Sequence, residues 1–273
     1  MDDNLYFLAE IFNNADMFLL IMVRLLGFFV IMPIFSGSSV PGMARMGFAA
    51  AFSIIIYTTG AYGNHAIFFH ENIIGFALIA ITEFLIGFVQ AYIVYIMFSM
   101  LYFVGQLLDR DIGFAMVSVL DPISQLQVPI IGNILFMLAM VIMIISDGLN
   151  FFLGALFQSY HIIPVGAVWF FEPYQAVSWH IIRVIIGSFE LGLRISMPIM
   201  GSILVVNLAL GMLLKSMPQM NMFVVGMPLK LVFGLGMLIV LLPIFANVSI
   251  TIFDRAFYHI EYVIFLFGTT AGQ

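Results

Sequence analysis

The stretch Phe84–Leu108 reads "FLIGFVQAYIVYIMFSMLYFVGQLL" and contains no charged residue. A helix needs about 20 mainly apolar residues to cross the hydrocarbon core of a bilayer, so this stretch is long enough to span one. Four more uncharged runs of comparable length are Pro122–Ser146, Gly148–Phe171, Ile195–Leu214 and Leu231–Phe253. Two less regular runs are Phe18–Phe35, which carries Arg24 and Pro33, and Met46–Phe69, which carries His65.

The composition of the whole chain agrees with these runs. Of its 273 residues, 64% are hydrophobic and 8% are charged, and the mean hydropathy is +1.19. These values lie far outside the range of soluble domains, so the sequence predicts an integral membrane protein. Open strands would leave backbone polar groups unpaired in lipid, and the sequence lacks the alternating pattern of a barrel. The predicted fold class is therefore all-α.

Charge and cysteine content exclude several functional classes. The formal net charge is −6 and the 8 lysines and arginines are scattered, which argues against a surface for nucleic acid. The chain has no cysteine, so it has no disulfide, thiolate nucleophile or Cys-ligated metal site. Its acidic start lacks the basic segment of a signal peptide, so we expect a mature N-terminus.

Breaks between the apolar runs indicate helical hairpins and broken helices rather than evenly spaced spans. Asp147 and Gly148 directly separate two long runs, and Pro198 and Pro228 lie near predicted helix starts or kinks. The positive-inside rule does not orient the chain, because most predicted loops carry one cation or none. No linker divides the chain, so any subdivision lies within one hydrophobic body.

Glycine and methionine are both abundant, with 23 and 20 residues. Small residues let helix backbones approach closely in a bundle. The predicted packing positions are Gly201, Gly211, Gly226, Gly234 and Gly236. The methionines fit either adaptable core filling or a deformable surface that seals around changing contents, and both roles are compatible.

Six ionisable residues lie within or beside the apolar runs: Arg24, Glu83, Glu190, Arg194, Lys215 and Lys230. Charges are costly in lipid, so each is expected to face protein or water and to serve a function. The alternative for any one of them is a contact with a partner subunit or a helix end, with the charge reaching an interface. Together they suggest that much of the apolar surface meets other polypeptide.

The sequence contains no convincing catalytic or metal-binding motif. His65, His70 and Glu71 are close in sequence, but their spacing is not the His-x-x-x-His that places two ligands on one helical face. A nucleophile elbow, a phosphate loop and a dinucleotide fingerprint are all absent. The aspartates between residues 109 and 121 lack the remaining ligands of a calcium loop. We therefore predict neither an enzyme nor a cofactor.

The segment Phe103–Pro129, "FVGQLLDRDIGFAMVSVLDPISQLQVP", interrupts the apolar pattern with charges, glycines and prolines. Three further segments accompany it in order: "SVPGMARMGFAAAFSI" (39–54), "SDGLNFFLGALFQSYHIIPVG" (146–166) and "VNLALGMLLKSMPQMNMFVVGMPLKLVFGL" (206–235). Jointly these segments resemble the flagellar biosynthesis protein FliR family, export-gate components of type III secretion, over roughly residues 24–243. The most specific pieces are Gly113 with Asp121-Pro122, Asp147-Gly148, Asn207–Gly211, Pro218-Gln219, and Gly226 with Pro228–Lys230.

The resemblance implies an assembly in the bacterial inner membrane, at the flagellar basal body. Proteins of this family assemble with several copies of FliP and FliQ, and one copy closes a helical ring around a central conduit. The implied partners are FliP, FliQ and FlhB, with unfolded flagellar proteins as cargo. Residues 1–187 would resemble FliP and residues 188–273 a FliQ hairpin, with a junction near Arg183–Glu190.

In this family, the segment equivalent to residues 105–127 is a loop that projects into the conduit as a plug. The implied plug residues are Gly105, Asp109, Arg110, Asp111, Ile112, Gly113, Phe114, Met116, Val119, Asp121 and Pro122. Glycines permit tight turns there, Pro122 limits helix continuation, and the charges tolerate a watery lumen. The charged triplet 109–111 departs from the family pattern. The alternative is an ordinary inter-helix loop, with Asp121 capping the helix that follows.

Two other functions stay open from the residues alone. A secondary transporter for a small solute would share the broken helices and buried charges, but it predicts an internal repeat around a midplane site, and no convincing repeat is visible. A structural scaffold without a gating role would differ from the export gate only in what the loop does.

Overall fold

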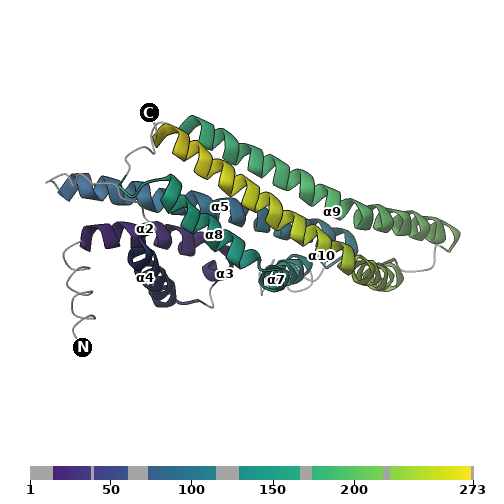
Figure 1. Ribbon diagram of the computed structural model, residues 1–273. Coiled ribbons are helices and arrows are strands. Elements are labelled where there is room, and N and C mark those ends of the chain that lie inside the picture. The colour runs from purple at the N-terminus through teal and green to yellow at the C-terminus, as the bar shows by residue number, and fades with distance from the viewer. Residues whose placement is uncertain are drawn as a thin grey trace. The chain divides into compact units, whose positions relative to one another are not determined.

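The computed structural model describes residues 15–37, 40–60, 73–114, 129–166, 174–217 and 222–271. Every secondary-structure element in these ranges is an α-helix, which confirms the predicted all-α fold (Figure 1). The helices are α2 (Ala15–Ile31), α3 (Pro33–Ser36), α4 (Gly42–Thr59), α5 (Ile73–Ile112), α7 (Ile130–Ile145), α8 (Gly148–Ile162), α9 (Tyr174–Ser216) and α10 (Met222–Ala271).

Proline and glycine set several of the helix ends. Pro33 is the first residue of α3, and Pro41 and Pro129 directly precede α4 and α7. Proline lacks a backbone N–H, which the first turn of a helix does not need, so it is well placed at these starts. Helix α4 ends at Thr59 and is capped by Gly60, whose φ of 64° lies in the left-handed region that favours glycine.

The break between α7 and α8 lies at Asp147, where the sequence predicted it. Asp147 has a φ of 58° and is the one non-glycine residue with positive φ in the described ranges. Its Oδ1 accepts a hydrogen bond from Asn150 Nδ2 at 3.2 Å, and its backbone oxygen accepts one from the Asn150 amide at 3.0 Å. Short polar side chains such as aspartate tolerate this conformation because they bond locally.

Prolines 198, 228 and 243 do not end the helices that contain them. Pro198 lies inside α9, and Pro228 and Pro243 lie inside α10. Each removes one backbone hydrogen bond from its helix. Neighbouring helices and Ser or Thr side chains commonly compensate such losses in membrane proteins.

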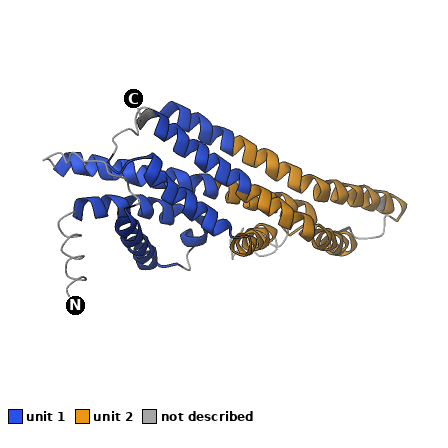
Figure 2. Ribbon diagram, in the orientation of Figure 1, with its two compact units in different colours: residues 1–95, 147–184, 254–273 blue, residues 96–146, 185–253 orange. Residues whose placement is uncertain are grey.

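The chain divides into two compact units, coloured separately in Figure 2. Unit 1 comprises residues 1–95, 147–184 and 254–273, and unit 2 comprises residues 96–146 and 185–253. Both units therefore draw on segments that are far apart in the sequence. The boundary predicted at residues 187/188 separates a FliP-like part from a FliQ-like part. Contacts within this chain do not test that resemblance, so the boundary stays a prediction.

An aromatic cluster fills part of the core of unit 1. The Phe29 ring on α2 stacks on Phe52 of α4, with 5.7 Å between centroids, and Phe35 meets Phe29 edge-on at 4.9 Å. Phe157 of α8 lies 5.9 Å from Phe52. Offset and edge-to-face arrangements of this kind are the favoured geometries for aromatic pairs. The cluster joins α2, α4 and α8.

Unit 2 is held by contacts along the second half of α5. Phe98 stacks on Phe253 of α10 at 5.5 Å, and Tyr102 stacks on Phe136 of α7 at 4.8 Å. Phe103 meets Phe189 of α9 edge-on at 4.9 Å. This half of α5 is thus packed against the parts of α7, α9 and α10 that belong to the same unit.

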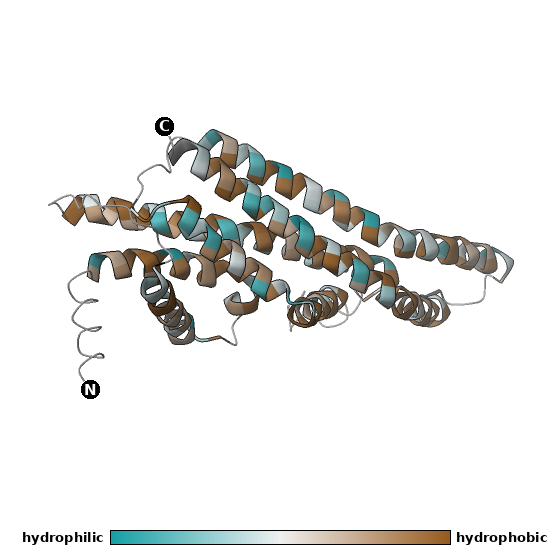
Figure 3. Ribbon diagram, in the orientation of Figure 1, coloured by the Kyte–Doolittle hydropathy of each residue, from teal (hydrophilic) through white to brown (hydrophobic). Residues whose placement is uncertain are grey.

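The outer faces of the long helices are strongly apolar. The helices long and apolar enough to cross a membrane, among the described residues, are Ile73–Ile112, Tyr174–Leu213 and Val224–Thr269, and the broken pair α7 with α8 makes up to a fourth. Hydrophobic residues dominate the ribbon in Figure 3, with polar residues interspersed along α9 and α10. Side chains such as Val232 (74% exposed) and Ile239 (68%) on α10 are largely uncovered by the described parts of the chain. These helices need lipid or other polypeptide around them.

Candidate functional site

The deepest polar feature of unit 1 is an ion pair between α2 and α5. Arg24 Nε donates to Glu83 Oε2 at 2.6 Å, and both side chains are fully buried. Glu83 Oε1 also accepts a hydrogen bond from the Gly166 amide at 2.8 Å. Two of the six embedded charges predicted from the sequence therefore neutralise each other inside the fold.

The rest of the Arg24 guanidinium binds the C-terminal end of α8. Its Nη1 donates to the carbonyl oxygens of Ser159 and Ile163, each at 3.2 Å, and Nη2 donates to Ile163 at 3.2 Å. The guanidinium carbon also lies 4.3 Å from the centre of the Tyr160 ring, a cation–π contact. A cation is favourable at a helix C-terminus, where carbonyl groups lack intrahelical partners.

We call this set, Arg24, Glu83, Ser159, Tyr160, Ile163 and Gly166, the charge cluster. It ties together α2, α5, α8 and the residues just after α8. Buried charges are tolerated only when paired and hydrogen-bonded, and this arrangement meets both conditions. We interpret the cluster as structural, because the Arg24 guanidinium and the Glu83 carboxylate are engaged with each other and with backbone groups of the fold.

Two glycines let α2 and α5 come close enough to form the charge cluster. A Cβ added at Gly27 would collide with the carbonyl oxygen of Phe84, and one added at Gly87 would collide with that of Arg24. Only the absence of a side chain permits backbones to approach this closely. Nothing in the sequence alone distinguishes these two glycines from the others.

In unit 2, the described part of the predicted plug segment begins within a helix. Helix α5 continues to Ile112, so residues 105–112 are helical rather than part of a loop. This stretch contains no proline to end the helix, and the apolar residues Leu108 and Ile112, four positions apart, are both fully buried by packing against other parts of the fold. Gly113, with a φ of 106°, then ends the helix in a conformation that favours glycine.

The last two turns of α5 contact the first turn of α7 through a hydrogen bond and close backbone packing. Asp109 Oδ1 accepts a hydrogen bond from the Ile131 amide at 3.2 Å, and Asp109 is only 7% exposed. A Cβ added at Gly105 would collide with the backbone of Gly132. We call Gly105, Asp109, Ile131 and Gly132 the stem, because it joins the two ends of the connection between α5 and α7.

Helix α10 packs beside the stem. A Cβ added at Gly234 would lie 2.6 Å from Ile112 Cγ1, and one at Gly113 would lie 3.9 Å from Met227 Cγ. Gly234 is thus a close-packed position within this chain.

The remaining predicted plug residues are placed only in part. Arg110 is exposed, while Asp111 and Phe114 are half-buried. Met116, Val119, Asp121 and Pro122 lie outside the described residues. The plug role of the segment stays a prediction.

Three of the other four embedded charges are exposed in this chain. Arg194 Nη2 and Glu190 Oε1 pair at 2.6 Å one helical turn apart on α9, with side chains 69% and 61% exposed. Lys215 is exposed and Lys230 is half-buried. None of these four residues joins the charge cluster.

The predicted packing glycines differ from one another. Gly226 is buried, whereas Gly201, Gly211 and Gly236 have no atom of the described chain within 4 Å of a built Cβ. Packing at these three positions against a neighbouring subunit stays a prediction.

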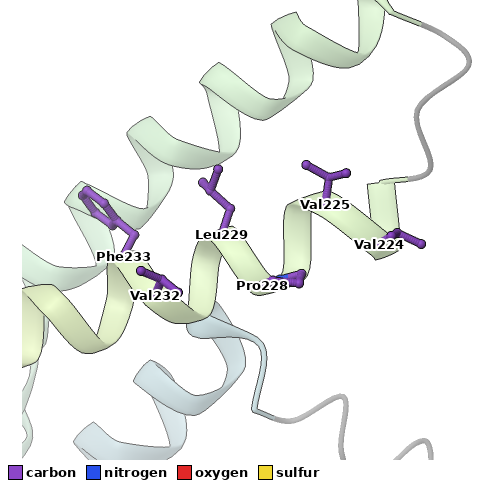
Figure 4. A pocket seen from close by; sticks show the side chains of 6 residues that line it. All are labelled: Val224, Val225, Pro228, Leu229, Val232 and Phe233. Carbon is purple, nitrogen blue, oxygen red and sulfur yellow. The ribbon is translucent and has the colours of Figure 1, made fainter.

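An open apolar groove of about 620 Å³ lies on the first turns of α10. Figure 4 shows the residues that line it, Val224, Val225, Pro228, Leu229, Val232 and Phe233. All six belong to one helix, and Leu229 projects toward α9 in this view. The six described side chains that line the groove are all apolar, so they offer a surface for packing rather than groups for chemistry.

A histidine pair in unit 1 escaped the sequence analysis. The rings of His180 on α9 and His259 on α10 lie 5.0 Å apart, and His180 stacks on Tyr262 at 4.5 Å. The two histidines are distant in sequence, so no local motif marks them. In the described parts of the chain, no group of three or more His, Cys, Asp or Glu residues is arranged to hold a metal ion.

The sequence of this chain is similar to those of known proteins. Residues 15–256 match the family described as bacterial export proteins, family 1. The chain is similar to the flagellar biosynthetic protein FliR of Bacillus subtilis, with 29% identity over 87% of this chain and 90% of that protein. Its similarity to FliR of Escherichia coli is 27% identity over 86% and 88%. The secretion system apparatus protein SsaT of Salmonella typhimurium is 28% identical over 59% of this chain and 61% of that protein.

Proposed function

The chain belongs to the bacterial export proteins, family 1, and we infer from this membership that it is a component of a flagellar or type III protein export apparatus. The observation that carries the inference is the extent of the match, which covers residues 15–256 and therefore nearly every described helix. The apolar helices fit a location in a membrane. This function requires no catalytic centre in the chain.

We further propose that the chain serves in the flagellar system. The FliR proteins of Bacillus subtilis and Escherichia coli match most of this chain, whereas SsaT matches a smaller share. Its location would then be the inner membrane at the flagellar basal body. The proposed cargo is unfolded flagellar protein, which a conduit rather than a closed pocket would pass.

The proposed partners are FliP, FliQ and FlhB, with one copy of this chain in a hetero-oligomeric ring. The apolar outer faces of α9 and α10 need lipid or other polypeptide around them, and an assembly would supply polypeptide. The groove on α10 and the open glycines Gly201 and Gly211 offer surfaces that another helix could cover. The exposed Glu190–Arg194 pair also fits a polypeptide or aqueous neighbour better than lipid.

Within that ring, residues 1–187 would take the place of a FliP-like part and residues 188–273 that of a FliQ-like hairpin. Helices α9 and α10 have the lengths that a long hairpin needs. We propose that the connection between α5 and α7 contributes the plug of the closed conduit. What supports this role is the stem, which brings the two ends of the connection together at one place.

A deletion tests the plug directly. Removing residues 115–119 spares Ile112, which packs on Gly234, and spares the stem. The complex should assemble, while ion leakage through the membrane should rise. The matched control is a deletion of equal length at residues 61–65, in the connection between α4 and α5, which should not add leakage. An intact complex without added leakage would contradict the plug role, and a complex that fails to assemble would make the segment a brace between subunits.

A transporter for a small solute is the other function that the residues left open. It would need a polar binding site within a self-sufficient chain. The groove on α10 is lined by apolar residues, and the family match points to protein export. The export function is therefore the better supported of the two.

A further inference from the structure

Asp109 is a buried carboxylate that interacts with the start of a different helix. The residue before α7 is Pro129, and its side chain makes no capping hydrogen bond. The first amides of α7 have no intrahelical partners and carry the positive end of the helix dipole. Asp109 Oδ1, from the last turn of α5, accepts from the Ile131 amide at 3.2 Å. The α7 N-terminus is therefore capped by a side chain 22 residues earlier in the sequence.

The two neighbours of Asp109 in the charged triplet are placed differently. Arg110 is exposed and Asp111 is half-buried, and neither makes a hydrogen bond to α7 in the described part of the chain. One member of the triplet thus has a structural partner. This arrangement gives a physical reason for an acidic residue at position 109.

The stem around Asp109 leaves little room for movement. On one side the backbones of Gly105 and Gly132 are in contact, so that no side chain fits between them. On another side Ile112 is fully buried and packs against Gly234 of α10. Opening the stem would therefore break the Asp109 cap and the close contact between Gly105 and Gly132 at the same time.

We propose that Asp109 is a positioning residue that holds the stem closed, so that the connection between α5 and α7 starts and ends at a fixed point during export. This inference rests on the proposed plug role. Its consequence is that any movement of the plug takes place beyond the stem. Asp109 acts through the α7 N-terminus and does not touch cargo.

Three variants test the cap itself, whatever the function of the complex. Asp109→Ala removes the acceptor, and Asp109→Asn keeps an acceptor oxygen without the charge. Asp111→Ala is the matched control. Hydrogen exchange at the first turn of α7 should be at least about fivefold faster in Asp109→Ala, intermediate in Asp109→Asn and unchanged in Asp111→Ala. Unchanged exchange in Asp109→Ala would overturn the cap.

Ion leakage tests what the cap does. In the assembled complex, Asp109→Ala should raise leakage, Asp109→Asn should restore most of the seal, and Asp111→Ala should behave as the unaltered chain. A purely structural role would lower the yield of complex without changing the leakage of what assembles, and that result would overturn the positioning role. If neither Asp109→Ala nor the deletion of residues 115–119 adds leakage, both the proposal for Asp109 and the plug role are wrong. If the deletion adds leakage and Asp109→Ala does not, only the proposal for Asp109 is wrong.

A cross-link tests whether the stem stays closed. The chain has no cysteine, so Asp109→Cys with Ile131→Cys can be bridged selectively by a short thiol-reactive linker. The unbridged double variant should leak, and bridging should restore the seal while protein export continues at its unbridged rate. Ile131→Cys alone, treated with the same linker, controls for the lost isoleucine. Export that stops on bridging would show that the stem must open, and the proposal would be wrong.

Discussion

Two ion pairs in this protein have the same length and very different surroundings. Arg24 and Glu83 meet at 2.6 Å with no exposed surface, and Arg194 and Glu190 meet at 2.6 Å with more than half of each side chain exposed. The first pair joins two helices and caps a third, while the second lies along one helical face. Burial, rather than distance, decides how much a charge pair matters to the fold.

The largest expected effect follows from breaking the buried pair. Glu83→Ala leaves the Arg24 guanidinium buried without its counter-charge, which should cost about 3 to 5 kcal/mol of folding free energy. The yield of folded chain in the complex should fall sharply, and thermal unfolding of what remains should occur at lower temperature. Glu190→Ala is the matched control. Equal yields for the two variants would contradict the conclusion that the buried pair matters more to the fold than the exposed pair.

The next effect concerns the close approach that brings the buried pair together. Gly87→Ala places a Cβ against the carbonyl oxygen of Arg24 and should destabilise the chain by about 1 to 3 kcal/mol through overpacking. Gly154→Ala, on an exposed face of α8 with nothing within 4 Å, should be neutral or slightly stabilising. The measurement is thermal unfolding of the purified complex. A neutral Gly87→Ala would mean that α2 and α5 separate readily.

A pair of glycine variants separates packing within the chain from packing between subunits. Gly234→Leu should displace Ile112 and cost about 1 to 3 kcal/mol, because the Ile112 side chain is β-branched and fully buried and so has little room to move aside. Gly211→Leu meets no described atom of this chain, so a loss of complex yield there would come from a neighbouring subunit. If Gly211→Leu leaves both yield and secretion unchanged, its predicted packing role is wrong.

The smallest expected effect belongs to the exposed pair. Glu190→Ala should change stability by only about 0.3 to 0.5 kcal/mol, since solvent and salt screen a pair of this kind. The difference from the unaltered chain should shrink further in high salt. Thermal unfolding at two ionic strengths measures it. A large loss that persists in salt would show that a partner subunit buries this pair in the complex.

The helices were predictable from the sequence to a large extent, because long apolar runs leave few alternatives in a membrane. The break at Asp147-Gly148 was also recognised from its residues, since both tolerate unusual backbone angles. The position at which α5 ends was harder to predict. Charges at 109–111 suggested a loop, but Asp109 is bonded to α7 and Ile112 is packed on α10, and such long-range contacts leave no local signal.

The charge cluster was only half visible in the sequence. Arg24 and Glu83 stood out as charges within apolar runs, but their pairing joins residues 59 positions apart. Gly27 and Gly87, which permit that pairing, looked like any other glycines. The pair His180 and His259 also left no local signal, because its two residues are far apart in the sequence. Composition identifies which side chains are costly to bury, and only the fold shows what offsets the cost.

The composition and mass of the complex purified through a tag on this chain test the central claim most directly. Native mass spectrometry should find a hetero-oligomer that contains a single copy of this chain and several copies of smaller helical membrane proteins. The chain expressed without those partners should aggregate or be degraded, because its apolar faces and open glycines then have nothing to pack against. A monodisperse, folded monomer in detergent would contradict the account of this protein as an export-gate subunit.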